Sequence, residues 1–168
     1  VGKSIAESLS REGLEVTVID ESIEAIKKIS DSLDVKTIIG AVGSPSILES
    51  ADAKNCDILI AVTKSDETNM IACQIAYTLF KVPTKIARIR NQDYLKQEWS
   101  NLYNKENLPI DFIISPESEV AQAIYRRLHA PGSIDMLELA DNRLKLIGLK
   151  CEENCPILNI SLRKLSQT

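Results

Sequence analysis

Hydrophobic residues recur at two different periods along the first 130 residues. Apolar residues three or four apart predict helices, and short apolar or β-branched runs between them predict strands. Helices are predicted at residues 3–12, 22–33, from 44 onward, 66–80 and 116–129. Strands are predicted at residues 16–20, 35–39, 57–63, 85–89 and 110–115. This alternation predicts βαβ crossovers and a parallel sheet covered by helices on both faces.

Local signals mark several helix ends. Gly13 is a C-terminal stop, and Ser22, Ser44, Ser65 and Ser115 stand where N-terminal caps are expected. The run DILIAVT at 57–63 is apolar throughout, which is typical of a strand buried on both faces. A further helix is expected near Asp93–Leu102, around the only tryptophan.

The opening stretch VGKSIAESLSREGLEVTVID begins on a helix, whereas each later helix follows a strand. We therefore interpret it as the second half of a βαβ unit. The fold class expected is α/β, a Rossmann-like doubly wound parallel sheet with its first strand missing.

The pattern changes at HAPGS, residues 129–133. Alternating residues follow, then a turn at Asp141–Asn142 and a second apolar run, LKLIGLK. This predicts a β-rich second lobe that is too short for an independent core. We expect residues 1–130 to form the nucleotide-binding domain and 131–168 to be the incomplete start of a C-terminal lobe.

Charge and hydropathy exclude several functions. The net charge of −4 and the scattered Lys and Arg residues argue against nucleic-acid binding and polybasic membrane attachment. No apolar run reaches the roughly 18 residues of a spanning helix, so direct membrane insertion is not expected.

The four cysteines are Cys56, Cys73, Cys151 and Cys155. CEENC has a three-residue gap in place of the two-residue gap of common zinc and redox motifs, so we expect reduced thiols. A disulfide or metal role remains the alternative.

Ligands of a doubly wound sheet bind at the carboxyl ends of its strands. Asp20 ends a predicted strand 18 residues after Gly2, close to the spacing between a glycine loop and its ribose-binding acid. A carboxylate accepts ribose hydroxyls and repels a 2′-phosphate, which favours NAD or an adenosine nucleotide over NADP. The alternative is an acid that caps the helix near Ser22.

Polar residues also follow the next two strands. Thr63 and Lys64 can border a ribose or base, although their loop can equally serve only to cap a helix. Arg88 and Arg90 project to the same side of their strand and can pair with phosphate. The alternative is a charged, solvent-facing edge.

Catalytic groups are scarce. The only histidine, His129, stands at a helix end, and the sequence has no Ser-His-Asp set, P-loop or metal-spaced His/Cys cluster. We therefore expect no catalytic residue, no metal ligand and no enzymatic activity.

The chain resembles the TrkA family of potassium-transport regulators, whose domains are called KTN or RCK. The resemblance rests on the opening stretch, DILIAVTKSDETNMIAC, KIARIRNQDY and DFIISPE, and more loosely on IDMLELADNRLKLIGLK and CPILNISLRKL. It implies a cytoplasmic regulatory subunit that binds NAD(H) or ATP/ADP and forms a homodimer or ring. Such a subunit is peripheral on the cytoplasmic face of the inner (plasma) membrane, where its partner is an integral-membrane potassium channel or transporter.

The resemblance also assigns site residues. It places Val1 and Gly2 at the tail of the glycine loop, Asp20 at the ribose, Thr63 and Lys64 beside the nucleotide, Arg88 at the phosphates, Arg90 at a phosphate or subunit contact, and Glu117 at a cation or helix end. Where the family often has Gly-Asp after its third strand, this chain has GAVG at 40–43, so one polar contact is expected to be lost.

Two alternatives remain open. One is an NAD-dependent oxidoreductase fragment that lacks its catalytic domain. The other is the cytosolic domain of a cation antiporter, which membrane helices upstream of residue 1 would reveal.

Overall fold

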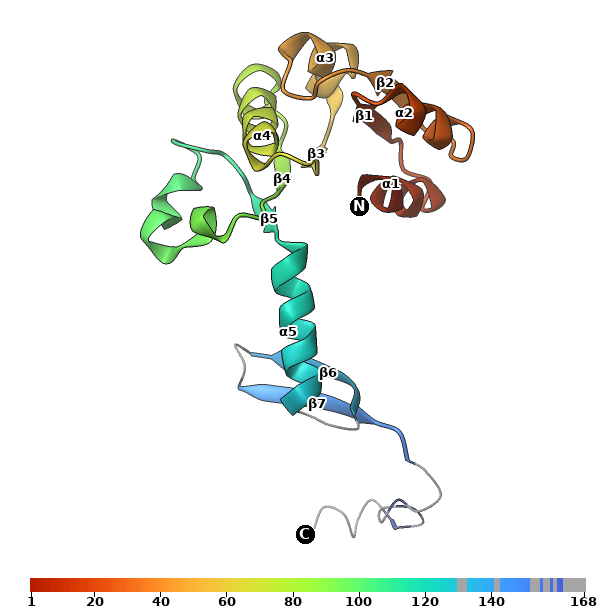
Figure 1. Cartoon of the computed structure of the whole chain (residues 1–168), viewed down its shortest axis with the longest axis vertical. Helices are drawn as coiled ribbons and strands as arrows, with labels where there is room; N and C mark the ends of the chain where they lie inside the picture. The colour runs from red at the N-terminus through yellow and green to blue at the C-terminus, as the bar shows by residue number, and fades with distance from the viewer. Residues whose placement is uncertain (130–132, 141–142, 152–154, 156–157, 159, 162–168) are drawn as a thin grey trace. The chain divides into compact units, whose positions relative to one another are not determined.

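The computed structural model describes residues 1–168 except 130–132, 141–142, 152–154, 156–157, 159 and 162–168. The chain divides into two compact units, Val1–Pro116 and Glu117–Thr168. Helix α5 begins at the junction of the two units (Figure 1). The domain boundary expected near residue 130 stays a prediction.

The first unit alternates helices and strands (Figure 1). Its elements are α1 Gly2–Arg11, β1 Thr17–Asp20, α2 Ile23–Ser30, β2 Lys36–Ile39, α3 Pro45–Ser50, the 3₁₀ helix η1 Ala53–Asn55, β3 Ile58–Ala61, α4 Asp66–Phe80, β4 Thr84–Arg88, the 3₁₀ helices η2 Gln92–Leu95 and η3 Gln97–Leu102, and β5 Phe112–Ile114. The predicted alternation is confirmed.

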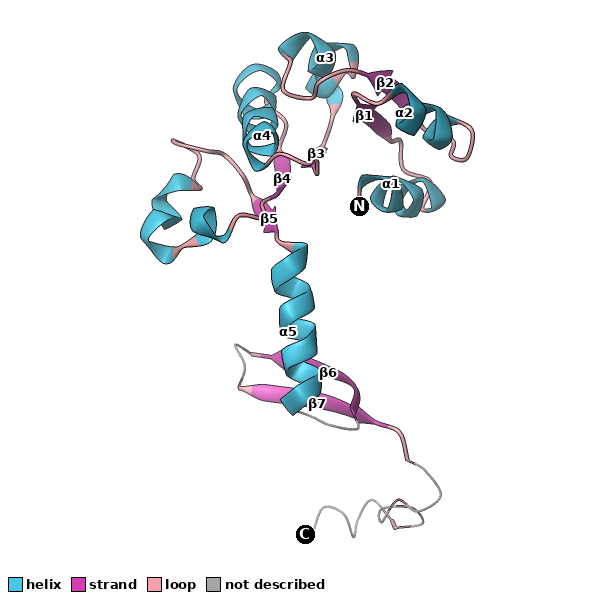
Figure 2. Cartoon of the chain, viewed as in Figure 1, coloured by secondary structure: helices cyan, strands magenta, loops and turns pink. Residues whose placement is uncertain are grey.

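All the strand pairs of this unit are parallel, as the crossovers predict (Figure 2). β1 pairs with β2, and β3, β4 and β5 pair in that order. In Rossmann order the first strand of the fold lies between these two groups. Among the described residues no strand occupies that position, in agreement with the fold class expected from the sequence.

The predicted helix ends are largely confirmed. Ser22 Oγ accepts the amide of Ala25 at 3.2 Å, and Ser65 Oγ accepts that of Thr68 at 3.1 Å. Gly13, just beyond α1, has a φ of +79°, a conformation that glycine adopts without strain. Ser44 occupies the N-cap of α3, but its side chain makes no capping hydrogen bond to the helix.

Small residues let α4 pack closely on the second sheet. Ala72, Cys73 and Ala76 of α4 are fully buried, and so is Ala87 of β4, while Ala61 of β3 is 2% exposed. These side chains bring the helix backbone near the strands and form much of the core. Cys73 is thus packed in the core as a small hydrophobe.

The segment expected to be one helix near Asp93–Leu102 is instead the two short 3₁₀ helices η2 and η3. Its apolar side chains, Tyr94 and Leu95 in η2 and Tyr103 just after η3, each pack against the core. Their spacing does not follow one helical face, so the backbone turns between them.

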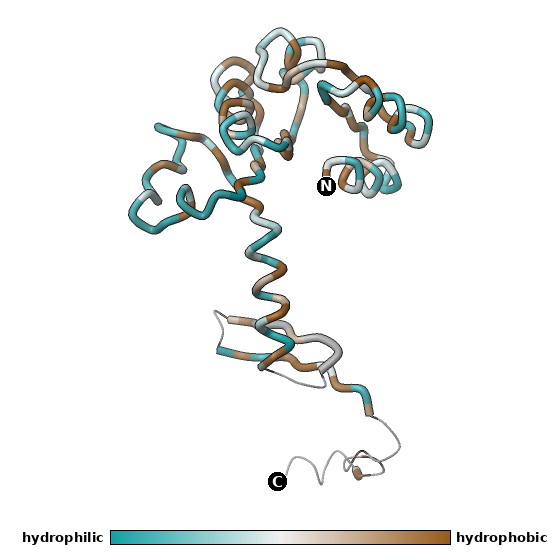
Figure 3. The backbone as a smooth tube through the Cα atoms, in the orientation of Figure 1, coloured by the Kyte–Doolittle hydropathy of each residue, from teal (hydrophilic) through white to brown (hydrophobic). Residues whose placement is uncertain are grey.

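The second unit contains α5 Pro116–His129 and a hairpin of β6 Ser133–Leu139 and β7 Leu144–Leu149. The two strands pair antiparallel, as their alternating sequence predicts. The turn expected at Asp141–Asn142 lies outside the described residues. Hydrophobic and hydrophilic positions alternate along α5 (Figure 3). Within the described residues, no helix has the length and hydropathy needed to cross a membrane.

Candidate functional site

The backbone of α1 comes close to the end of β3. A Cβ atom added to Gly2 would lie 3.4 Å from Cγ2 of Val62, the residue after β3. That distance is at the lower limit of ordinary van der Waals contact, so the backbone at Gly2 lies close to Val62. The start of α1 therefore lies beside the loop that follows β3. Gly2 has no side chain to separate the α1 backbone from Val62.

The first turn of α1 fits an anion. Val1 is its N-cap, no side chain caps the turn by a hydrogen bond, and the turn contains no acidic residue. Amides at a helix N-terminus and the helix dipole favour negative charge. The predicted glycine-loop residues Val1 and Gly2 are thus at the end of a helix suited to phosphate.

Asp20 is the last residue of β1 and is exposed. Its Oδ1 accepts the backbone amide of Ser22 at 2.8 Å, in the turn that leads into α2. This is the contact expected from the alternative interpretation of Asp20 as a capping acid. It engages one carboxylate oxygen, and the ribose role of Asp20 stays a prediction.

The loop after β3 is held by its own hydrogen bonds. The Thr63 amide donates to Asn69 Oδ1 at 2.8 Å, and Thr63 Oγ1 lies 2.7 Å from the same oxygen. The Ser65 amide donates to Thr63 Oγ1 at 3.2 Å. The hydroxyl of Thr63 therefore shapes the loop, and the Lys64 side chain is left exposed at its tip.

The end of β4 presents the two arginines on one side, as predicted. Lys85, Ala87 and Ile89 are buried, while Arg88 is half-buried and Arg90 exposed. The Arg90 guanidinium donates to the backbone carbonyl of Lys64, so the ends of β3 and β4 are in contact. Thr63, Lys64, Arg88 and Arg90 are thus brought together.

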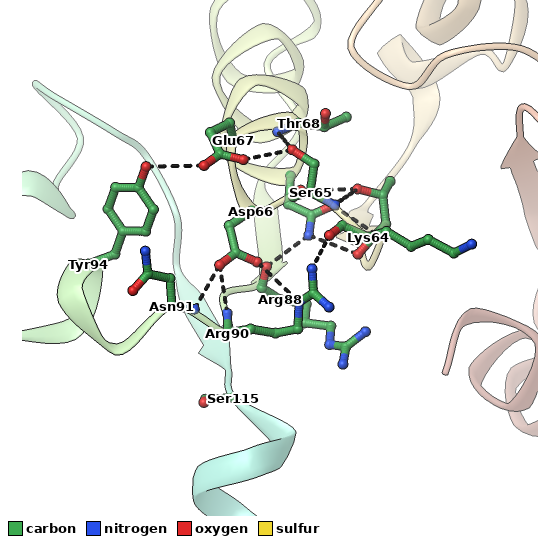
Figure 4. A network of polar contacts seen from close by, with 12 residues as sticks. Lys64, Ser65, Asp66, Glu67, Thr68, Arg88, Arg90, Asn91, Tyr94 and Ser115 are labelled. Carbon is green, nitrogen blue, oxygen red and sulfur yellow. Dashed lines mark hydrogen bonds and ion pairs between the residues drawn. The ribbon is translucent and has the colours of Figure 1, made fainter.

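Two residues of α4 that the sequence did not single out for the site, Asp66 and Asn69, join these segments. Figure 4 shows Asp66 with its contacts to Arg90 and Asn91. Asp66 Oδ2 accepts the amides of Arg90 at 2.9 Å and Asn91 at 2.8 Å. Asn69 Nδ2 donates to the carbonyl oxygen of Arg88 at 2.8 Å. Asp66 is 6% exposed and Asn69 is fully buried. The available signal was two polar residues three apart on a helix with an otherwise apolar buried face.

A second hydrogen-bond chain runs from this loop to η2. Ser65 Oγ donates to Glu67 Oε2 at 2.8 Å, and Tyr94 Oη donates to Glu67 Oε1 at 3.2 Å. Hydrogen bonds from its own amide and from Ser65 lower the pKa of Glu67. The charge of Glu67 and its hydrogen bond raise the pKa of Tyr94. Both shifts favour a charged acceptor and a neutral donor in this pair.

Glu117 lies in the first turn of α5 and is exposed. It belongs to the second unit, so its predicted role at a cation or helix end stays a prediction. In the part of the chain that the structure describes, no group of three or more His, Cys, Asp or Glu residues could hold a metal ion.

The strands of this unit are parallel, are joined by crossover helices and carry polar residues at their carboxyl ends. These features define a Rossmann-like domain. A sequence profile of the TrkA-N domain family matches residues 1–116. The chain belongs to that family, which confirms the resemblance noted in the sequence.

Curated relatives support the same family. The chain is 42% identical over 167 residues to the Trk system potassium uptake protein TrkA of Azorhizobium caulinodans, covering 99% of this chain and 36% of the relative. It is 41% identical over 150 residues to the protein of the same name from Haemophilus influenzae, covering 89% and 32%. The chain thus spans about a third of the length of these relatives.

Solved structures share the fold at low identity. The TrkA-N domain of the Escherichia coli inner membrane protein ybaL superposes with a TM-score of 0.63 at 18% identity, covering 76% of this chain and 89% of that one. The GsuK channel bound to NAD gives a TM-score of 0.61 at 13% identity, covering 83% and 23%. These likenesses confirm the α/β class.

Proposed function

We propose that this chain is the nucleotide-binding part of a regulatory subunit that controls potassium uptake. The observation that carries the proposal is the close approach of Gly2 to Val62. It brings the N-terminus of a helix beside the loop at the end of β3, where Thr63 and Lys64 lie. Relatives named Trk system potassium uptake protein TrkA, aligned over nearly the whole chain, supply the biological context.

The residues fit a nucleotide in their chemistry. When bound, the nucleotide supplies a negatively charged phosphate group and ribose hydroxyls. The amides at the start of α1 and the guanidinium of Arg88 hold the phosphates, and Asp20 accepts from the ribose. Thr63 fixes the loop that borders the ligand, and Lys64 adds positive charge at its tip.

The ligand we propose is NAD(H), with ATP or ADP as the alternative. Both contain an adenosine ribose that a carboxylate at Asp20 can accept from. Among the structures that share the fold, GsuK was solved bound to NAD and also bound to ADP, and the Shewanella denitrificans Kef C-terminal domain in an AMP-bound form. Their low identity supports the fold and leaves the choice of nucleotide to experiment.

Regulation by this chain follows from differential binding. A ligand shifts an assembly between conformations only by as much as its affinity for them differs. We propose that the chain acts within a homodimer or ring, on the cytoplasmic face of the plasma membrane. The shift between conformations of the assembly then changes the potassium flux through an integral-membrane channel or transporter subunit.

This function is regulatory and not catalytic. The oxidoreductase alternative requires an acid/base group next to the nicotinamide. Around the ends of β3 and β4, Asp66 accepts two backbone amides and forms an ion pair with Arg90, and Asn69 holds Thr63 and Arg88. Relatedness to Trk proteins over nearly the whole chain also favours the regulator.

Calorimetric titration of the full-length protein with NADH, NAD⁺, ADP and ATP tests the proposal. We expect micromolar or tighter binding of at least one nucleotide, and a loss of about tenfold in affinity for Asp20→Ala because a charged hydrogen-bond acceptor is removed. Glu21→Ala, the exposed acid next in the chain, is the matched control. Absence of binding by all four nucleotides would overturn the proposal, and unchanged affinity in Asp20→Ala would remove the ribose assignment.

A further inference from the structure

Asn69 is a polar side chain with no exposure to solvent. It lies in the N-terminal part of α4, and its amide group contacts two strand ends at once. Oδ1 accepts the amide of Thr63 at 2.8 Å, and Nδ2 donates to the carbonyl oxygen of Arg88 at 2.8 Å. The orientation of the amide is dictated by these partners, because a backbone N–H can only donate and a carbonyl can only accept.

These two contacts span neighbouring strands. Ala61 of β3 pairs with Ala87 of β4, so Thr63 and Arg88 lie just beyond adjacent ladder positions. The β3–β4 ladder ends at this point. Beyond it, the Asn69 side chain links the two strand ends by its hydrogen bonds to Thr63 and Arg88. Asp66, one turn earlier, adds the amides of Arg90 and Asn91 to the same attachment.

Asparagine alone satisfies this geometry. An aspartate offers two acceptors and no donor, which would set a carboxylate against the carbonyl oxygen of Arg88. A serine or alanine is too short to reach both strand ends, and a glutamine carries its amide one carbon further. The site therefore requires one donor and one acceptor, held rigidly in a buried position.

We propose that Asn69 is a positioning residue for nucleotide binding, which sets Thr63 and Arg88 at a fixed separation without touching the ligand. This inference rests on the proposed function, since Thr63 borders the nucleotide there and Arg88 holds its phosphates. A bound nucleotide then meets two strand ends that are already in register. The affinity of the site depends on a buried amide that lies behind it.

The substitution Asn69→Asp separates positioning from general damage. It keeps the size of the side chain and the acceptor for the Thr63 amide, and it removes the Nδ2 donor to the carbonyl oxygens of Arg88 at 2.8 Å and Thr63 at 3.5 Å. At pH 8 we expect nucleotide affinity about tenfold or more below that of the wild type, because a buried carbonyl loses its donor and faces a negative charge. As the pH falls to about 5, protonation of the introduced carboxyl restores a donor, and the affinity should recover.

The sign follows from burial. A carboxyl group that is buried beside a carbonyl oxygen has its pKa raised above the ordinary value, so its protonated form, which can donate, is more populated at pH 5 than at pH 8. The charged groups that join the two strand ends, Asp66, Arg88 and Arg90, are present in both proteins. The ratio of variant to wild-type affinity at each pH therefore isolates the introduced group.

Asn107→Asp is the matched control. Asn107 Nδ2 donates to a backbone carbonyl, that of Asn101, at 2.8 Å, the same distance as in the Asn69 contact, but Asn107 is exposed. The control removes the same kind of donor and adds the same charge away from the site. We expect its nucleotide affinity to equal that of the wild type at every pH.

The experiment titrates the full-length proteins with NADH and ADP by calorimetry between pH 5 and pH 8, with circular dichroism to follow folding. Affinity that falls in Asn69→Asp at pH 8 and recovers at pH 5 supports the inference. Unchanged affinity, or a loss that does not depend on pH, overturns it while the proposed function stands. If the Asn69→Asp protein unfolds at pH 8, refolding and nucleotide binding at pH 5 support the inference, and failure to bind at pH 5 overturns it. A wild type that binds neither nucleotide overturns the proposed function itself.

Discussion

Lys85 and Asp111 form an ion pair in which one partner is almost completely removed from water. Lys85 Nζ lies 2.7 Å from Asp111 Oδ2, with the lysine side chain 3% exposed and the aspartate side chain 31% exposed. The same carboxylate oxygen accepts the Lys85 backbone amide at 2.7 Å. The pair thus ties β4 to the residue that precedes β5.

Asp111→Asn should destabilise the fold by about 3 kcal/mol, because it leaves the buried Lys85 charge without its anionic partner. Urea unfolding followed by circular dichroism measures the difference. The control is Asp93→Asn, which breaks the exposed ion pair between Asp93 and Lys96. That change should cost less than about 1 kcal/mol, and equal losses in the two variants would contradict the role assigned to burial.

The Lys85–Asp111 pair should also make stability depend on acid. Burial by itself raises the pKa of Asp111, but the hydrogen bonds from the Lys85 side chain and amide and the lysine charge outweigh it, so the pKa lies below its ordinary value. A carboxyl with a lowered folded-state pKa contributes stability above its unfolded pKa of about 3.9, and this is lost as the pH falls through the folded-state pKa.

We therefore expect the stability gap between the wild type and Asp111→Asn to be constant above about pH 5 and to shrink as the pH falls toward about 2. Urea unfolding curves at several pH values measure the gap. A gap of the same size at pH 7 and pH 2 would show that ionisation of Asp111 contributes nothing.

Cys73 should resist alkylation in the folded protein. Burial raises the pKa of its thiol to about 12, and the side chain has no exposure. At pH 8 the reactive thiolate is then only about one molecule in ten thousand. Peptide mass spectrometry after iodoacetamide treatment should show Cys151, which is exposed, reacting on the order of 100-fold faster. In urea the two rates should converge, and equal rates in the native protein would refute the burial of Cys73.

Gly13→Ala should cost about 1 kcal/mol, because an alanine there must adopt the left-handed conformation after α1. No heavy atom lies within 4 Å of the added Cβ, so steric contact adds nothing to the cost. Gly43→Ala is the control, since its φ is ordinary and its nearest contacts are at 3.9 Å. Thermal unfolding measures both, and a Gly13→Ala protein as stable as the control would contradict the strain.

The sequence anticipates what short stretches determine by themselves. Ser22, Ser65 and Gly13 mark helix ends through contacts within a few residues, and the apolar run at 57–63 predicts the strand β3. Its expected burial on both faces is wrong at the start of the strand, because Ile58 is 51% exposed and only Ala61 of β3 is buried. The parallel pairing follows because each strand is separated from the next by a crossover. The candidate site at the start of α1 and the ends of β3 and β4 was predicted because ligands of a doubly wound sheet bind at the carboxyl ends of its strands.

What the sequence did not show depends on residues far apart in the chain. Asp66 is the first residue of α4, where the helix dipole favours an acid, yet its carboxylate accepts amides more than 20 residues away. Lys85 stands in an ordinary strand pattern, and its burial depends on Asp111, the carbonyls of Val82 and Pro83, and the ring of Tyr77. A local pattern contains no information on such partners.

The edges of β1 and β3 that face away from their partner strands have a consequence for strand pairing. Among the described strands, β1 pairs only with β2 and β3 only with β4, and Ile58 of β3 is 51% exposed. A strand edge with unpaired amides and carbonyls is a template on which another extended chain can add. The edges of β1 and β3 are therefore positions at which a further extended strand can pair.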